Sequence, residues 1–171
     1  LSQTLKKVFY MGDGACAVEV AMKMSLHAHL IQGQTQRTRF IALENGYHGE
    51  TVGALSVSDQ GVFKSPYESL TFDVALISQL PRVSSEKDPL WSDCSAIWPQ
   101  IQAQLDPLAD TCTALILEPI VQGAAGMHLY SQDFLKRIRH WTQANNIHLI
   151  ADEIMTGIGR TGRALACEHA G

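Results

Sequence analysis

The residues best placed to do chemistry follow an apolar segment near the end of the chain. Residues 147–151 are typical of a buried strand in a parallel sheet, and Asp152 and Glu153 come directly after them. Ligands of open α/β sheets bind just beyond the carboxyl ends of strands, so Asp152 is a candidate cofactor contact. A carboxylate there needs a cationic or hydrogen-bonding partner, because burying it alone is costly. A protonated ring nitrogen would be such a partner.

A glycine turn near the start of the chain is a candidate phosphate site. We predict a short strand over residues 8–11, a turn at 12–14 and a helix over residues 15–31. Free backbone N–H groups and the helix dipole make such a corner attractive to an anion, and small residues allow close approach. An ordinary glycine turn into a helix is the competing interpretation, and on this feature alone it is the commoner case.

Polar side chains also follow two other predicted strands. Tyr47 comes after the strand at 39–43, and an aromatic ring there can stack on a flat ligand or simply line the rim. His48 beside it is interpreted as a hydrogen-bonding structural residue, not as a base. Glu118 ends the strand at 113–117, where it would orient a bound ring or pair with an arginine.

The last motif is the loop that contains Arg160. Its glycines at 157, 159 and 162 have the spacing of a dinucleotide-binding fingerprint, but no clear helix follows the loop. We therefore reject that interpretation and expect the loop to direct Arg160 into the cleft. Because all these residues follow or end strands, we predict one cleft around Gly14, Tyr47, Glu118, Asp152 and Arg160.

The elements that position these residues alternate between strands and helices. Further helices are predicted over 98–105 and from a Ser131 cap to about residue 144. Residues 60–99 are predicted to be a surface excursion with at most one strand, near 74–77. In the helix at 15–31, the predicted apolar face consists of Ala17, Val20, Ala21, Met24 and Leu26, and Glu19 and Lys23 are predicted to form a pair on the solvent-facing side.

The alternation of strands and helices along the chain predicts an α/β fold with a mainly parallel sheet.

Composition narrows the possible partners and compartment. The chain has 171 residues, is 46% hydrophobic and carries a formal net charge of −4, which fits one domain and argues against nucleic acid or an anionic membrane as partner. The four cysteines form no CxxC pair, so no metal site or disulfide framework is predicted, and a reducing cytoplasm is the expected compartment. No apolar run is long enough to span a bilayer.

The order of these motifs resembles the class III, fold type I aminotransferases. The resemblance is carried by the strings at residues 17–24, 45–49, 118–127, 151–154 and 166–170, which together span nearly the whole chain. Val121-Gln122-Gly123 and Cys167-Glu168-His169-Ala170 favour the biotin-pathway branch of this family over its ornithine and 4-aminobutyrate branches. The resemblance implies pyridoxal 5′-phosphate as cofactor, S-adenosylmethionine and 8-amino-7-oxononanoate as substrates, and a homodimeric parent enzyme.

The resemblance also implies a role for each candidate residue. Gly14 and Ala15 would bind the cofactor phosphate through backbone N–H groups, with Cys16 beside them. Asp152 would pair with the protonated ring nitrogen, and Glu118 would lie at the cofactor. Tyr47 would stack on the ring and shape the substrate site, and Arg160 would meet a substrate carboxylate. Three residues depart from the family pattern, because Ala15 replaces a usual serine, Asp13 adds a negative charge beside the phosphate, and Glu50 replaces the aspartate common after His-Gly.

The lysine that the reaction needs is expected outside this sequence. In the family it follows the strand aspartate by about thirty residues, which lies past Gly171, and none of the six lysines in the chain falls on a motif that could replace it. Residues 1–171 would then be the central part of the large cofactor-binding domain, without the N-terminal segment and the C-terminal small domain, and inactive alone. Another class III ω-aminotransferase and a non-catalytic remnant that acts as an interaction module remain alternatives.

Overall fold

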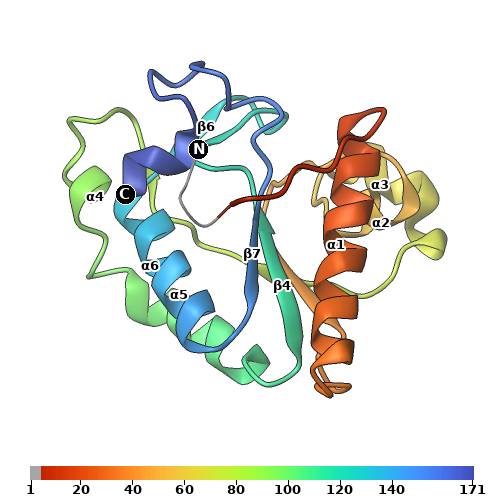
Figure 1. Cartoon of the computed structure of the whole chain (residues 1–171). Coiled ribbons are helices and arrows are strands. Elements are labelled where there is room, and N and C mark those ends of the chain that lie inside the picture. The colour runs from red at the N-terminus through yellow and green to blue at the C-terminus, as the bar shows by residue number, and fades with distance from the viewer. Residues whose placement is uncertain (1–4) are drawn as a thin grey trace.

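A four-stranded parallel sheet forms the centre of the molecule (Figure 1). The computed structural model describes residues 5–171. The strands lie in the order β2 (Ala75–Ile77), β1 (Arg39–Leu43), β4 (Cys112–Leu117) and β7 (His148–Ala151), and each neighbouring pair is parallel. The α/β class with a mainly parallel sheet, predicted from the alternation of elements, is confirmed.

Helices cover both faces of this sheet. Strand β1 alternates, with Ile41 and Leu43 in one buried cluster and Phe40 and Ala42 in the other. Helix α1 (Gly14–Ile31) packs on the face of Phe40, whereas α5 (Trp98–Leu105) and α6 (Gln132–Ala144) pack on the opposite face (Figure 1). All six residues of β4 are buried, as expected for a central strand covered on both sides.

Helix α6 begins where the sequence predicted. The Ser131 hydroxyl accepts a hydrogen bond from the Phe134 N–H at 3.3 Å, and Asp133 lies in the first turn, near the positive end of the helix dipole. The helix ends at Ala144, before Asn146, whose φ of 54° is left-handed.

Helix α1 has the predicted bounds but a different buried face. Its buried residues are Val18, Met22, Ser25 and His29. The predicted face is wrong, because Met24 and Leu26 are 58% and 38% exposed. Ser25 and His29 are buried because Thr113 of β4 supplies hydrogen-bonding partners to both. The rotation of α1 about its axis is therefore set by hydrogen-bonding partners on the sheet, and not by the number of apolar residues on each face of the helix.

The strand predicted over residues 8–11 is also wrong. No regular element forms between residue 5 and α1, and Val8, Phe9 and Tyr10 are 70%, 69% and 89% exposed. A strand needs a neighbour to accept its backbone hydrogen bonds, and no strand among residues 5–171 pairs with this segment.

The remaining elements are short. A small antiparallel sheet has the order β3 (Arg82–Val83), β6 (His128–Tyr130) and β5 (Val121–Gln122). Short helices are α2 (Val52–Ser56), α3 (Gly61–Lys64), α4 (Pro89–Ser92) and the 3-10 turns η1 (Ser65–Leu70), η2 (Asp106–Leu108) and η3 (Ala166–Ala170). Residues 60–99 thus hold two strands, β2 and β3, and not the single one predicted. Within residues 5–171, no helix has the length and apolar character that a bilayer crossing requires.

Candidate functional site

Asp152 lies just beyond the carboxyl end of β7, and its backbone and side chain together make three contacts that hold it in place. Its backbone N–H donates to the Leu117 carbonyl at 2.8 Å, which continues the β4–β7 pairing by one residue. Its Oδ1 accepts from the Ile154 N–H at 3.2 Å, and its Oδ2 lies 2.8 Å from His48 Nδ1. The side chain is only 7% exposed, so this carboxylate is nearly withdrawn from water.

The loop after β1 carries Tyr47 and His48 to the same place. The Tyr47 N–H donates to Glu118 Oε1 at 3.1 Å, and the His48 N–H donates to the Ser58 hydroxyl at 2.9 Å. Because β4 lies between β1 and β7, the His48 side chain passes the end of β4 to reach Asp152. The loop therefore connects the ends of three strands.

Glu118 is buried at the end of β4, and both of its carboxylate oxygens accept backbone hydrogen bonds. Oε1 accepts from Tyr47 and Oε2 accepts from the Gly123 N–H at 2.9 Å. Burial raises the pKa of this carboxyl group, and the two N–H donors oppose that rise. With both oxygens occupied, Glu118 fixes the two loops that flank the candidate site.

The start of α1 lies against these loops. A Cβ placed on Gly14 would be 3.3 Å from Ile154 Cγ1, and a Cβ placed on Gly49 would be 2.6 Å from the Ala15 Cβ. The first N–H groups of a helix have no acceptor within the helix, so the start of α1, beside the loop that follows Asp152, carries the kind of donors that an anion site needs. The glycine corner thus lies beside Ile154, two residues beyond Asp152.

Asp13 caps α1 and alters this anion site. Its carboxylate accepts from the Cys16 N–H at 2.8 Å, which also lowers the pKa of Asp13 below its ordinary value. The Cys16 N–H is therefore not free for a ligand. The Ala15 N–H contributes more weakly to the same lowering of this pKa, so the Asp13 carboxylate lies beside the first N–H groups of the helix.

The Tyr47 ring is half-buried beside the site. It packs against Phe63 with a centroid separation of 5.4 Å, and its hydroxyl donates to Glu50 Oε1 at 3.1 Å. Burial, followed by this contact with Glu50, raises the pKa of the tyrosine hydroxyl. The hydroxyl therefore stays protonated around neutral pH and holds the Glu50 side chain.

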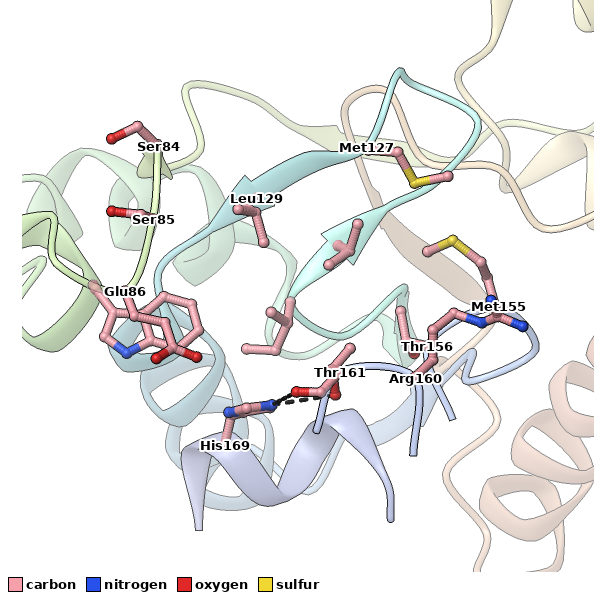
Figure 2. A pocket seen from close by; sticks show the side chains of 13 residues that line it. Ser84, Ser85, Glu86, Met127, Leu129, Met155, Thr156, Arg160, Thr161 and His169 are labelled. Carbon is pink, nitrogen blue, oxygen red and sulfur yellow. Dashed lines mark hydrogen bonds between the residues drawn. The ribbon is translucent and has the colours of Figure 1, made fainter. Parts of the chain in front are cut away.

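Arg160 lies in a different place from the other candidates. It lines a pocket of about 500 Å³ together with Glu86, Trp91, Met155 and His169 (Figure 2). The lining of this pocket includes none of Gly14, Tyr47, Glu118 and Asp152. The structure connects those four residues through the contacts above, and it does not bring Arg160 into the same group.

Comparison with known sequences decides the family. Residues 2–171 match the family described as Aminotransferase class-III. The chain belongs to the class III aminotransferases. Members of this family depend on pyridoxal 5′-phosphate, as the sequence resemblance implied.

The most informative relatives carry one activity in their names. An adenosylmethionine-8-amino-7-oxononanoate aminotransferase of Helicobacter pylori is 40% identical over 96% of this chain. An enzyme of the same name from Synechococcus elongatus is 39% identical over 100% of it. The chain spans 36% and 39% of the lengths of these two relatives.

Solved structures agree with the fold. The crystal structure of adenosylmethionine-8-amino-7-oxononanoate aminotransferase from Methanocaldococcus jannaschii matches with a TM-score of 0.79 and 33% identity, over 96% of this chain and 35% of that one. A PLP-bound amine transaminase from an uncultivated Pseudomonas species matches with a TM-score of 0.78 and 34% identity, over 91% of this chain and 36% of that one. Both support the assignment of the sheet to fold type I.

The residues present fit the family's cofactor. Asp152 is a nearly buried carboxylate, and among residues 5–171 its only ion-pair candidate is the His48 imidazole, so a protonated ring nitrogen would complete its surroundings. The N–H groups at Gly14 and Ala15 suit a phosphate. The Asp13 carboxylate is an unfavourable charge at this corner.

The contacts of two residues could not be predicted from the sequence alone. His48 was interpreted as a hydrogen-bonding structural residue, and its contact with Asp152 agrees with that, but the identity of the partner was not predicted. Glu19 was placed outside α1, whereas its Oε1 accepts from the Thr51 hydroxyl and from the N–H groups of Gly53 and Ala54. No local pattern distinguishes such a carboxylate from an exposed one.

Proposed function

We propose that the protein containing this chain catalyses the pyridoxal-phosphate-dependent transfer of an amino group from S-adenosylmethionine to 8-amino-7-oxononanoate, a step of biotin biosynthesis. The observation that carries the proposal is the Asp152 carboxylate, 7% exposed at the end of β7 and beside the start of α1. The shared name of the relatives at 40% and 39% identity supports the choice of substrates.

The residues of this chain would hold and tune the cofactor. The N–H groups of Gly14 and Ala15 bind its phosphate, Tyr47 packs on its ring, and Asp152 keeps the ring nitrogen protonated. When bound, the cofactor supplies a carbonyl that accepts the amino group and a ring that withdraws electrons. Glu118 holds the loops of Tyr47 and Gly123 together by accepting a backbone hydrogen bond from each. Cys16 lies next to the N–H groups that would bind the phosphate.

Other features of the whole enzyme belong to the same proposal. The reactive lysine lies downstream of Gly171, so residues 1–171 bind the cofactor without turnover. The parent enzyme is a cytoplasmic homodimer, which would cover exposed apolar residues such as Phe63, Tyr67 and Phe72. Arg160 meets the substrate carboxylate after the remaining parts of the protein complete its pocket.

The test compares two lengths of the protein. Residues 1–171 should bind pyridoxal 5′-phosphate weakly and without a borohydride-trapped lysine adduct, and Asp152→Asn should abolish that binding. A chain extended through the downstream lysine should convert 8-amino-7-oxononanoate to 7,8-diaminononanoate with S-adenosylmethionine, and Asp152→Asn should lower the rate by at least tenfold. Turnover by residues 1–171, with trapping at one of their own lysines, would refute this division of roles.

A second activity is favoured by the amine transaminase at 34% identity. If the extended chain uses simple amines and ignores S-adenosylmethionine, the function is that of another class III ω-aminotransferase. If no lysine-bearing extension exists and the cofactor does not bind, the chain is a non-catalytic remnant that acts as an interaction module.

A further inference from the structure

The loop that contains Arg160, residues 154–165, is closed at its base by one carboxylate. Glu153 precedes the loop, and its Oε2 accepts a hydrogen bond from the Thr156 hydroxyl at 2.9 Å. The same oxygen accepts from the Ala166 N–H at 2.9 Å. Its Oε1 accepts from the Cys167 N–H at 2.9 Å and from the Cys167 thiol. The carboxylate therefore joins the first residues of the loop to the residues that follow it.

These four donors satisfy Glu153 without a cation. Within the described residues 5–171 its side chain takes part in no ion pair, and Thr156 and Ala166 are fully buried. Burial, followed by the contact with Glu153, raises the pKa of the Cys167 thiol to about 12, so the thiol stays protonated and can donate. A carboxylate is acceptor-only, whereas an amide in its place would turn an NH₂ group toward some of these donors.

A chain of contacts leads from Glu153 to the neighbour of Arg160. The N–H groups that Glu153 holds are the first two of η3, and η3 contains His169. The His169 Nε2 donates to the Thr161 carbonyl at 3.0 Å and lies 3.2 Å from the Thr161 hydroxyl (Figure 2). Glu153 therefore fixes the base of the loop and, through η3, the residue next to Arg160.

The tip of the loop is open to solvent. Ile158 is 96% exposed, and Arg160 and Arg163 are exposed as well. Apolar burial therefore contributes little to the order of the tip, which depends on the hydrogen bonds at its two anchor points.

We propose that Glu153 is a positioning residue, which keeps the loop at 154–165 closed and thereby directs Arg160 toward the carboxylate of a substrate. A guanidinium on a fixed loop loses less conformational freedom when it binds a carboxylate than one on a mobile loop does, so closure increases affinity. Two adjacent carboxylates then have separate roles, because Asp152 serves the cofactor and Glu153 serves the substrate. This inference rests on the proposed contact of Arg160 with substrate.

Limited proteolysis of the complete protein measures the closure of the loop without any turnover. Glu153→Gln keeps the size of the side chain but cannot accept from all four donors. It should speed trypsin cleavage after Arg160 and Arg163 about tenfold, as expected for lost hydrogen bonds to a charged group. Cleavage after Arg139, exposed on α6, should keep its rate, which separates a loosened loop from a loss of the whole fold.

The matched control for this experiment is Glu168→Gln, which makes the same change at an exposed glutamate of η3 and should leave the digestion pattern unaltered. If Glu153→Gln gives no faster cleavage at either arginine of the loop, the closing role is overturned.

Steady-state kinetics of the complete protein test the consequence for substrate binding. S-adenosylmethionine and 8-amino-7-oxononanoate both contain a carboxylate, and Glu153→Gln should raise the KM of one of them about tenfold. Its affinity for pyridoxal 5′-phosphate should stay within about threefold of the unmodified protein. Thr156→Val removes one of the four donors and should raise the same KM by a smaller factor.

A double-substitution cycle decides whether Glu153 acts through Arg160. In an Arg160→Gln background, Glu153→Gln should have no further effect on that KM. If Arg160→Gln itself leaves both KM values unchanged, the proposed contact of Arg160 with substrate fails. If Arg160→Gln raises a KM but Glu153→Gln does not, or if the two effects add in full, only the positioning role fails. Thr156→Val takes the place of Glu153→Gln in the digestion and in the cycle if Glu153→Gln does not fold.

Discussion

Ser25 of α1 and His148 of β7 are joined by a hydrogen bond of 2.8 Å between Oγ and Nδ1. The Ser25 hydroxyl also lies 2.8 Å from the Thr113 hydroxyl, and the His29 ring lies 4.6 Å from the ring of His148. These contacts connect the helix to β4 and to the edge strand β7. They are made at the starts of both strands, because Thr113 and His148 lie at the opposite strand ends from Glu118 and Asp152.

The contact of His148 predicts a dependence of stability on pH. Burial, then the neighbouring His29 and Arg37, lowers the pKa of His148 below its ordinary 6.5. As the pH falls below that value, the unfolded chain binds this proton before the folded protein does, so the free energy of unfolding should fall. Above that value His148 contributes no pH dependence.

Urea unfolding at a series of pH values measures this effect. His148→Asn should flatten the acid side of the stability curve, and His27→Asn, at an exposed position of α1, should leave its shape unchanged. An equal loss of stability in the unmodified protein and in His148→Asn would contradict the assignment.

Gly49 should resist substitution. Its φ of 122° is unfavourable for other residues, and a Cβ there would lie 2.6 Å from the Ala15 Cβ and 3.3 Å from the Ala54 Cβ. We expect Gly49→Ala to destabilise the fold by about 2 kcal/mol or more. Gly61→Ala is the matched control, since nothing lies within 4 Å of a Cβ at Gly61, and thermal unfolding compares the two.

Glu19 should contribute to stability although it was predicted to be exposed. Its Oε1 accepts three hydrogen bonds from residues 51–54 at the start of α2. Glu19→Ala should therefore cost about 1.5–3 kcal/mol, the range for hydrogen bonds to a charged group. Lys23→Ala, one turn further along α1 and exposed, should change the unfolding free energy by less than about 0.5 kcal/mol.

The charge of Asp13 should weaken binding of the cofactor phosphate. Asparagine is an equally good helix cap, so Asp13→Asn removes the charge while it keeps the contact with the Cys16 N–H. We expect the affinity for pyridoxal 5′-phosphate to rise by up to about fivefold, because a solvated negative charge close to the phosphate is removed. Absorbance titration measures this, and an unchanged or weaker affinity would show that the phosphate binds elsewhere.

The elements that the sequence predicted correctly depend on local patterns. Helix α5 and the Ser131 cap of α6 follow from periodicity and capping residues, which act over a few neighbouring positions. The sheet of β3, β6 and β5 was missed because strands of two or three residues are too short to show a period. The false strand at 8–11 has the residues of a strand but no partner within residues 5–171.

The sequence by itself determined the α/β class and the carboxyl-end positions of Tyr47, Glu118 and Asp152, because apolar strands and the residues that end them can be recognised locally. Only the tertiary structure decided that His48 reaches past β4 to Asp152, and that α1 buries Ser25. It alone separated the pocket of Arg160 from the other candidates. These relations depend on the order of strands in the sheet and on the rotation of a helix against it. Both are set by contacts between residues far apart in the sequence, which no local pattern records.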